Sequence, residues 1–358
     1  MNLMIDFYKG KSVFVTGHTG FKGSWLCKAL VLCGAQVTGY SLAPDTTPNL
    51  FELSGLEGQM TSVIGDIRDF DSLKKAFDDA KPEIVFHLAA QPIVREGYKN
   101  PLYTYETNVM GTANLLECIR HSTTVRSVLN VTTDKVYKNF EVNRGYREDE
   151  QLDGYDPYSN SKSCSELVTH CYKSSYLSDM NISVSTARAG NVIGGGDFSV
   201  DRIIPDCCRA AMSGNSVSIR NPLSIRPYQH VLEPIYAYMM LAFKQYIDIE
   251  KADWYNVGPD DIDCVTTGEL VSLFANSWGD GFSWQTVAND GPHESGILKL
   301  DCSKIKSVFG WKPMWNVNKA VEKTVEWFKA YRDGLSVSEF MDDQINKYFD
   351  EQREFNNV

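Results

Sequence analysis

Short apolar segments alternate with helix-like segments through the first half of this 358-residue chain, and this alternation constrains the fold most. Strand-like runs, rich in β-branched and other apolar residues, are expected at 12–16, 36–40, 62–64, 83–88, 127–132 and 182–187. Helices are expected at 24–32, 71–79, 107–121 and from 157 onward. Alternation at this spacing predicts an α/β fold with a doubly wound, mostly parallel sheet.

The alternation loosens after residue 188 into short strands, turns and scattered prolines. Helices are expected at 201–212, 265–277 and 317–332, and in a polar tail from Ser336 that we expect to be loosely attached. No low-complexity linker separates the two halves. We therefore predict a sheet domain over residues 1–187 and a smaller, interlaced C-terminal α/β lobe over residues 188–358, with some segments returning to the first domain.

Composition excludes several classes of protein. A formal net charge of -11 argues against nucleic acid or an anionic membrane as the main partner. The first residues lack the apolar core of a signal peptide, and no 18-residue apolar run occurs. The nine cysteines form no C-x-x-C pair, which indicates reduced thiols in a cytoplasmic protein and no disulfide framework or metal site.

A glycine-rich loop follows the first expected strand. Gly17, Gly20 and Gly23 are spaced as G-x-x-G-x-x-G, with a strand before them and a helix after them. In a Rossmann fold such glycines allow a tight turn, close approach of the backbone to a pyrophosphate, and packing of the helix on the strand. The loop therefore predicts a bound dinucleotide, although a glycine-rich turn without a ligand is the alternative.

The residues after the second strand favour NAD over NADP. The acidic residue that usually binds the ribose hydroxyls is missing there, and Asp45 comes late. No Lys or Arg occurs between Ala29 and Ile67, so this stretch offers no cation for a 2′-phosphate. Asp66 and Ile67 either hold the adenine or form a simple turn, and the sequence leaves both possibilities open.

Tyr158 and Lys162 form the strongest catalytic pair in the chain. They are four residues apart in an expected helix, so they share one face, and the helix would start with Asp156 as its cap and Pro157 in its first turn. A phenol with a pKa of about 10 is a poor base, and a neighbouring ammonium together with a positive nicotinamide should lower that pKa. Thr133, at the end of the fifth strand, is placed to share a hydrogen bond with the substrate hydroxyl.

Asp134 and Lys135 follow Thr133 directly. Hydride transfer needs only the tyrosine, lysine and threonine, whereas a further carboxyl and amine would serve to eliminate water. The alternative is an exposed ion pair in a loop, because most charged side chains are solvated. The residues expected to contact the cofactor are Gly17, His18, Gly20, Phe21, Lys22, Gly23, Asp66, Ile67, Leu88, Ala89, Ala90, Gln91, Thr107, Tyr158 and Lys162.

Several motifs resemble those of a known family. The segments 15–26, 132–137, 188–197 and 226–234 and the tyrosine–lysine pair resemble the extended short-chain dehydrogenases/reductases. Among these, the Gly-His-Thr-Gly-Phe-Lys-Gly opening and the Arg-Pro-aromatic-Gln-His-Val run are similar to the CDP-glucose 4,6-dehydratases over nearly the whole chain. Lys135 matches that subgroup, whereas Tyr228 and Phe198 stand where tryptophan is common.

The resemblance implies a lyase that uses bound NAD. CDP-D-glucose would become CDP-4-dehydro-6-deoxy-D-glucose and water, with Tyr158 taking the proton of the hydroxyl on carbon 4. Lys135 would remove the proton on carbon 5, and Asp134 would protonate the departing hydroxyl on carbon 6. For the substrate diphosphate we expect Arg226 first, since a guanidinium matches phosphate geometry, and then Arg202 and His293. Asn191 matches a family position that contacts substrate or nicotinamide.

Two other functions remain open from the sequence. A sugar-nucleotide 4-epimerase would keep Tyr158 and Lys162 but would not need the second acid and base. A dinucleotide-sensing regulator would share the scaffold, although such proteins typically lose the tyrosine–lysine pair. The resemblance also implies a homodimer or homotetramer, assembled through 108–121 and 159–177, and a role in making deoxysugars for a bacterial surface polysaccharide.

Overall fold

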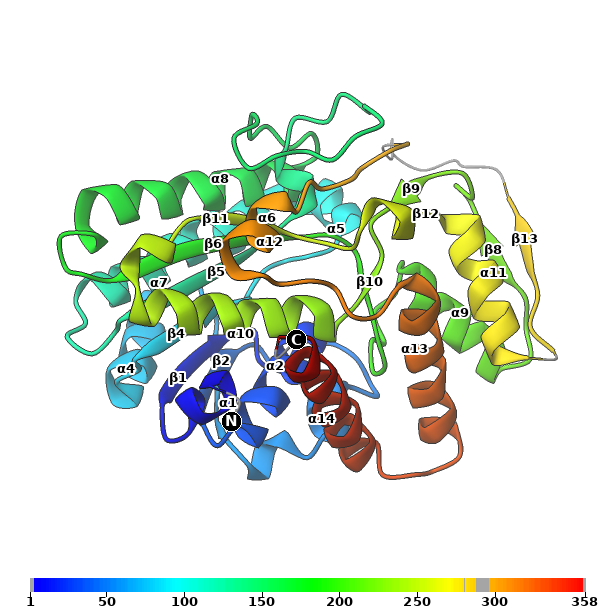
Figure 1. The fold of residues 1–358 in the computed structure, drawn as a ribbon, viewed down its shortest axis with the longest axis horizontal. Coiled ribbons are helices and arrows are strands. Elements are labelled where there is room, and N and C mark those ends of the chain that lie inside the picture. Colours follow the sequence, from blue (N-terminus) through cyan, green and yellow to red (C-terminus); the bar gives the residue numbers. More distant parts are fainter. Residues whose placement is uncertain (1–2, 280, 288–295, 357–358) are drawn as a thin grey trace.

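A computed structural model describes residues 3–279, 281–287 and 296–356. Seven strands form one sheet in the order β11-β6-β5-β4-β1-β2-β3 (Figure 1). Every neighbouring pair in this sheet is parallel, as predicted for a doubly wound fold. The strands are β1 (Ser12–Thr16), β2 (Gln36–Ser41), β3 (Thr61–Ile64), β4 (Ile84–His87), β5 (Ser127–Thr133), β6 (Ser183–Ala189) and β11 (Trp254–Val257).

Alternate residues of the strands serve two separate cores, one on each face of the sheet. Val13 and Val15 of β1 pack in the larger core, whereas Phe14 between them packs in the smaller one. The larger core includes residues of α2 (Phe21–Leu32) and α10 (Leu232–Ile247), and the smaller one includes residues of α4 (Phe70–Ala80) and α7 (Gly111–Arg120). Because both faces are covered by helices, the central strands β1, β4, β5 and β6 are buried over nearly their whole length.

The C-terminal half of the chain contributes to this sheet. Strand β11 pairs with β6 at the sheet edge, and α10 packs on β5 and β6. We did not predict α10 from the sequence. Thirteen of its sixteen residues are buried, so it lacks the alternation of apolar and polar faces by which a surface helix is recognised.

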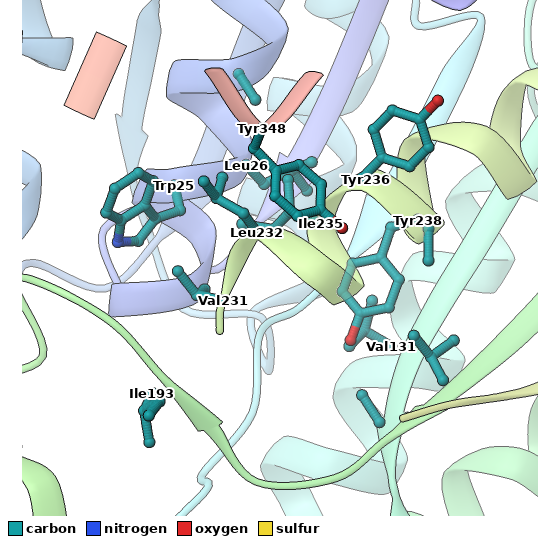
Figure 2. Packing of buried hydrophobic residues seen from close by; sticks show 14 of the residues in the cluster. Trp25, Leu26, Val131, Ile193, Val231, Leu232, Ile235, Tyr236, Tyr238 and Tyr348 are labelled. Carbon is teal, nitrogen blue, oxygen red and sulfur yellow. The ribbon is translucent and has the colours of Figure 1, made fainter. Parts of the chain in front are cut away.

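The C-terminal helix α14 (Val337–Asn356) packs firmly, so the expectation of a loosely attached tail is wrong. Its Met341, Ile345, Tyr348 and Phe349 are buried. Figure 2 shows Tyr348 close to Leu26 of α2 and to Leu232 and Ile235 of α10. The apolar residues recur three and four positions apart, and this stripe covers the outer side of α2 and α10.

A second group of elements stands beside the sheet (Figure 1). Its helices α9 (Ile203–Met212), α11 (Thr267–Trp278) and α13 (Val317–Arg332) contact one another. Three two-stranded pairs complete it: β7 (Val192–Ile193) with β10 (Gln229–His230), β9 (Ile225–Arg226) with β12 (Val265–Thr266), and β8 (Val217–Ile219) with β13 (Trp284–Thr286). Among the helices of the described residues, none combines the length and the apolar character needed to span a membrane.

The remaining elements are short, apart from α8 (Pro157–Tyr172), which starts where Asp156 and Pro157 predict. The other helices are α1 (Leu3–Tyr8), α3 (Leu50–Leu53), α5 (Val94–Lys99), α6 (Pro101–Tyr105) and α12 (Ser303–Phe309). Single helical turns of other types are η1 (Leu56–Gly58), η2 (Glu106–Met110), η3 (Asp134–Val136), η4 (Lys173–Leu177), η5 (Ile249–Lys251) and η6 (Asp261–Asp263). The helix expected over 107–121 is thus a π-helical turn, η2, followed by α7.

Candidate active site

A cavity of about 770 Å³ lies where the carboxyl ends of β1, β4, β5 and β6 meet the second group of elements. This is the edge of a parallel sheet at which doubly wound folds bind their ligands. The predicted site residues that line it are Gly17, Gly20, Phe21, Lys22, Gly23, Asp66, Ile67, Leu88, Ala89, Ala90, Gln91, Thr107, Thr133, Asp134, Lys135, Tyr158, Lys162, Asn191, Arg202 and Arg226. His293 lies outside the described residues.

The glycine loop packs too closely for side chains at two of its positions. Gly17 has a φ of +77°, and a Cβ there would lie 2.8 Å from the backbone nitrogen of Ala89. A Cβ on Gly23 would lie 2.0 Å from the carbonyl oxygen of Gly17. Helix α2 begins at Phe21, three residues earlier than expected, so its N-terminus opens into the cavity. Free N–H groups at a helix N-terminus suit the pyrophosphate of a dinucleotide, so these residues fit such a cofactor.

The side chain of His18 does not line the cavity, although we predicted that it contacts the cofactor. Its side chain is fully buried, its Nε2 lies 2.7 Å from Ser62 Oγ, and burial lowers its pKa to about 4. The imidazole therefore packs inside the fold, against Gly39, and does not form part of the cavity wall. Its role is to fill the space between the loop and β2 and β3.

Two carboxylates, from segments that follow β2 and β3, line the part of the cavity that we assign to the adenosine of the cofactor. Asp66 accepts hydrogen bonds from the backbone and the guanidinium of Arg68, and this guanidinium lowers the pKa of Asp66. The turn predicted as one possibility for Asp66 is therefore present, and Asp66 also lines the cavity. Asp45 lines the same cavity despite its late position after β2, so a carboxylate is available for ribose hydroxyls.

Tyr158 stands in the first turn of α8, held there by the helix cap. The carboxylate of Asp156 accepts a hydrogen bond of 3.1 Å from the backbone N–H of Ser159. Burial is the main cause that raises the pKa of Tyr158 to about 12; within this net value Asp134 also raises the pKa, while Thr133 and Arg202 lower it. The predicted lowering of this pKa includes the charge of the nicotinamide; among the protein's own groups, burial outweighs the neighbouring cations and the pKa is raised.

Two lysines, Lys162 and Lys22, line the same cavity as Tyr158, and burial favours the neutral form of both. Lys162 Nζ donates to the carbonyl of Val131 at 3.3 Å, and burial lowers the pKa of Lys162 to about 8. Lys22 lies within 3.5 Å of the Tyr238 hydroxyl, and burial with the charges of Arg202 and Lys162 lowers its pKa to about 7. Both amines can therefore exchange protons near neutral pH.

Asp134 and Lys135 lie in the cavity wall, so the alternative of an exposed loop ion pair is wrong for Asp134. Asp134 is 1% exposed, its Oδ1 accepts from Thr133 Oγ1 at 2.9 Å, and its Oδ2 has no hydrogen-bond partner among the described residues. Burial raises the pKa of Asp134, which favours the protonated form of a general acid. Lys135 Nζ lies 5.9 Å from the centre of the Tyr158 ring.

Cationic side chains line the part of the cavity nearest the second group of elements. Arg202 pairs with Asp197 at 3.2 Å, and Arg226 is buried and donates to the carbonyl of Ile225. Two further arginines, Arg95 and Arg220, also line the cavity, and no motif in the sequence indicates them. A concentration of guanidinium groups at one end of a cavity suits a diphosphate.

Comparison with known proteins identifies the family. Residues 14–324 match the family described as GDP-mannose 4,6 dehydratase. The chain is 48% identical over 339 residues to a CDP-glucose 4,6-dehydratase from Salmonella typhimurium, covering 92% of this chain and 94% of that protein. The chain belongs to the GDP-mannose 4,6 dehydratase family. This membership confirms the resemblance to sugar-nucleotide dehydratases of the extended short-chain type.

Solved structures agree with this dehydratase family in fold. A dTDP-glucose 4,6-dehydratase from Bacillus anthracis, solved with NAD, superposes with a TM-score of 0.75 at 20% identity, covering 91% of this chain and 99% of that one. A UDP-glucose-4-epimerase from Stenotrophomonas maltophila, solved with NAD and formylated UDP-arabinopyranose, gives 0.80 at 21% identity, covering 90% and 99%. At these identities the likeness confirms the doubly wound fold and does not separate dehydratases from epimerases.

Two glycine substitutions should separate the structural from the binding role of the loop. Gly23→Ala forces a Cβ onto the carbonyl of Gly17, so we expect a loss of stability of roughly 1–3 kcal/mol together with loss of NAD binding. Gly20→Ala is the matched control, because its Cβ would lie 3.5 Å from the same oxygen, and it should keep its melting temperature. Thermal unfolding and NAD titration measure both effects. Equal melting temperatures for the two variants would contradict the conclusion that a Cβ fits at position 20 but not at position 23.

Proposed function

We propose that the protein is a CDP-glucose 4,6-dehydratase, which converts CDP-D-glucose to CDP-4-dehydro-6-deoxy-D-glucose and water. NAD is the cofactor, and when bound it supplies a hydride acceptor for carbon 4 and a hydride donor for carbon 6. Residues 1–187 bind NAD and carry the catalytic groups, and segments beyond 188 bind the nucleotide sugar. The observation that carries this proposal is a buried Asp134 beside Lys135 and Tyr158 in one cavity, in a chain 48% identical to a protein of that activity.

The first chemical task belongs to Tyr158. Its phenolate accepts the proton of the hydroxyl on carbon 4, with the Thr133 hydroxyl close to the phenol. Burial is the largest of the effects that together raise the pKa of Tyr158 to about 12, so the phenolate needs nearby positive charge. We assign this role to Lys162, which lies on the same helix and lines the same cavity. In this proposal the ammonium of Lys162 also donates to the ribose of the cofactor.

The elimination of water uses Asp134 and Lys135. A carbonyl at carbon 4 acidifies the proton on carbon 5, which neutral Lys135 removes, while protonated Asp134 donates to the hydroxyl leaving carbon 6. The raised pKa of Asp134 supports the protonated state that this role requires. Hydrogen bonding of Thr133 to Asp134 Oδ1 leaves Oδ2 as the oxygen that carries the transferable proton.

A panel of four nucleotide sugars tests this function directly. CDP-, TDP-, UDP- and GDP-glucose are incubated separately with the enzyme and NAD, and the 4-keto product is followed by its absorbance in alkali. We expect product from CDP-glucose, and turnover of the other three slower by roughly a hundredfold or more. Equal turnover of TDP- or GDP-glucose would contradict the assigned substrate. Formation of an epimerised sugar would contradict the assigned reaction.

Lys135→Met separates dehydration from epimerisation, because an epimerase needs no base for carbon 5. We expect formation of the 4-keto-6-deoxy product to fall on the order of 10²–10⁴-fold, while oxidation at carbon 4 survives as absorbance of reduced nicotinamide. Tyr158→Phe is the matched control and should lose both signals. Retained dehydration in Lys135→Met would remove Lys135 from the mechanism.

The proposal extends to assembly and location. We propose a homodimer in which η2, α7 and α8 of each subunit pack together, since Met110 and Leu167 are apolar and more than half exposed there. A homotetramer built from two such dimers is the larger possibility. The nine cysteines are free thiols, which supports a cytoplasmic enzyme, and the family suggests a pathway to deoxysugars of a surface polysaccharide.

A charge placed in the proposed interface should break the dimer. Met110→Glu and Leu167→Glu would bury carboxylates between subunits, so we expect the mass from light scattering to fall to that of a monomer. Ile262→Glu is the control, because Ile262 is 89% exposed and lies in η6, outside η2, α7 and α8, so the mass of this variant should match wild type. An unchanged mass in both interface variants would place the contact elsewhere.

A further inference from the structure

A buried carboxylate below the catalytic helix has no part in the mechanism above. Glu166 follows Lys162 by four residues on α8, so the two side chains leave the same face of the helix. Its side chain is 0% exposed. A fully buried carboxylate is costly unless several donors satisfy it, so its partners indicate what it holds in place.

The partners of Glu166 come from the sheet. Thr186 Oγ1 donates to its Oε2 at 2.7 Å, and Arg188 Nη2 donates to the same oxygen at 2.9 Å, both from β6. Thr132 Oγ1, next to Thr133 on β5, donates to Oε1. These bonds tie the middle of α8 to the two strands whose ends carry Thr133, Asp134 and Asn191 into the cavity.

Arg188 continues this network away from the cavity. Its guanidinium is 1% exposed and donates to the Tyr137 hydroxyl at 2.9 Å and to the carbonyl of Glu148 at 3.0 Å. Burial opposes ionisation of Glu166, but the charge of Arg188 and hydrogen bonds from His170, Arg188 and Thr132 outweigh it and lower the pKa of Glu166 to about 2. Glu166 therefore keeps a negative charge at every physiological pH.

Lys162 is surrounded mainly by groups that do not stabilise its charge. Lys22 on α2 repels it, and His87 on β4 is neutral, since burial and the Lys162 charge lower the pKa of His87 to about 3. Tyr158 on the same helix is neutral until it ionises. The charge on Glu166 raises the pKa of Lys162 against the effect of burial.

We propose that Glu166 is a positioning residue for the reaction: its buried carboxylate anchors α8 to β5 and β6 and supplies the negative charge that keeps Lys162 an ammonium. This inference rests on the proposed function only through the role of Lys162. Without the carboxylate, Lys162 would lose its proton at lower pH, and a neutral amine would no longer stabilise the Tyr158 phenolate. Glu166 thus acts through Lys162 and does not touch the substrate.

The test measures the protonation of Lys162 directly. Purified protein without substrate is labelled with acetic anhydride across a pH range, and mass spectrometry follows acetylation of Lys162, since only the neutral amine reacts. In Glu166→Gln we expect the midpoint to fall by about 1–2 pH units. The alkaline limb of kcat/KM should move in the same direction, while KM for the nucleotide sugar stays near that of wild type.

Two further variants keep the test decisive. Glu166→Gln leaves the charge of Arg188 buried and unpaired, so the double variant Glu166→Gln/Arg188→Met removes both charges and is used if the single variant does not fold. Glu148→Gln is the matched control, because it removes another carboxylate near Arg188, and its Lys162 midpoint should not move. An unchanged midpoint in a folded Glu166 variant would overturn the proposal, and this result would not depend on which nucleotide sugar is the substrate.

Discussion

Parallel pairing of β1, β4, β5 and β6 is the constraint on which the site depends. Because parallel strands all end at the same edge, the segments that follow them converge there, however far apart they lie in the chain. The glycine loop follows β1, and the Thr133-Asp134-Lys135 run leaves β5. Helix α8, which packs on β5 and β6, carries Tyr158 to the same edge, and the cavity then needs only a wall from the second group of elements.

Burial is the main cause of the pKa shifts of the ionisable groups at this edge of the sheet. It raises the pKa of Asp134 and lowers those of Lys22 and Lys162, so acids become more readily protonated and amines more readily neutral. A dehydratase needs such states, since one group must give a proton while another takes one. Burial also raises the pKa of Tyr158, so the mechanism requires positive charge beside the phenol.

Much of the first half was predictable because its signals are local. The glycine loop, the Asp156 cap and the tyrosine–lysine spacing each operate within a few residues, and the structure has the strand, the cap and the helix where these patterns indicate them. Helix α10 was missed because a helix buried on nearly all sides has no amphipathic pattern. His18 was assigned to the cofactor from its place in the loop, but its orientation depends on contact with β2 and β3.

By itself, the sequence determined the fold class and the glycine loop and indicated the candidate catalytic groups, because periodicity and motif spacing are properties of neighbouring residues. Only the tertiary structure decided which of those groups are buried, and therefore which protonation states they favour. It also brought Glu166 of α8 together with Thr132 of β5 and Arg188 of β6, through contacts between residues 20 or more positions apart. Such contacts follow from the packing of helix on sheet, which no local pattern encodes.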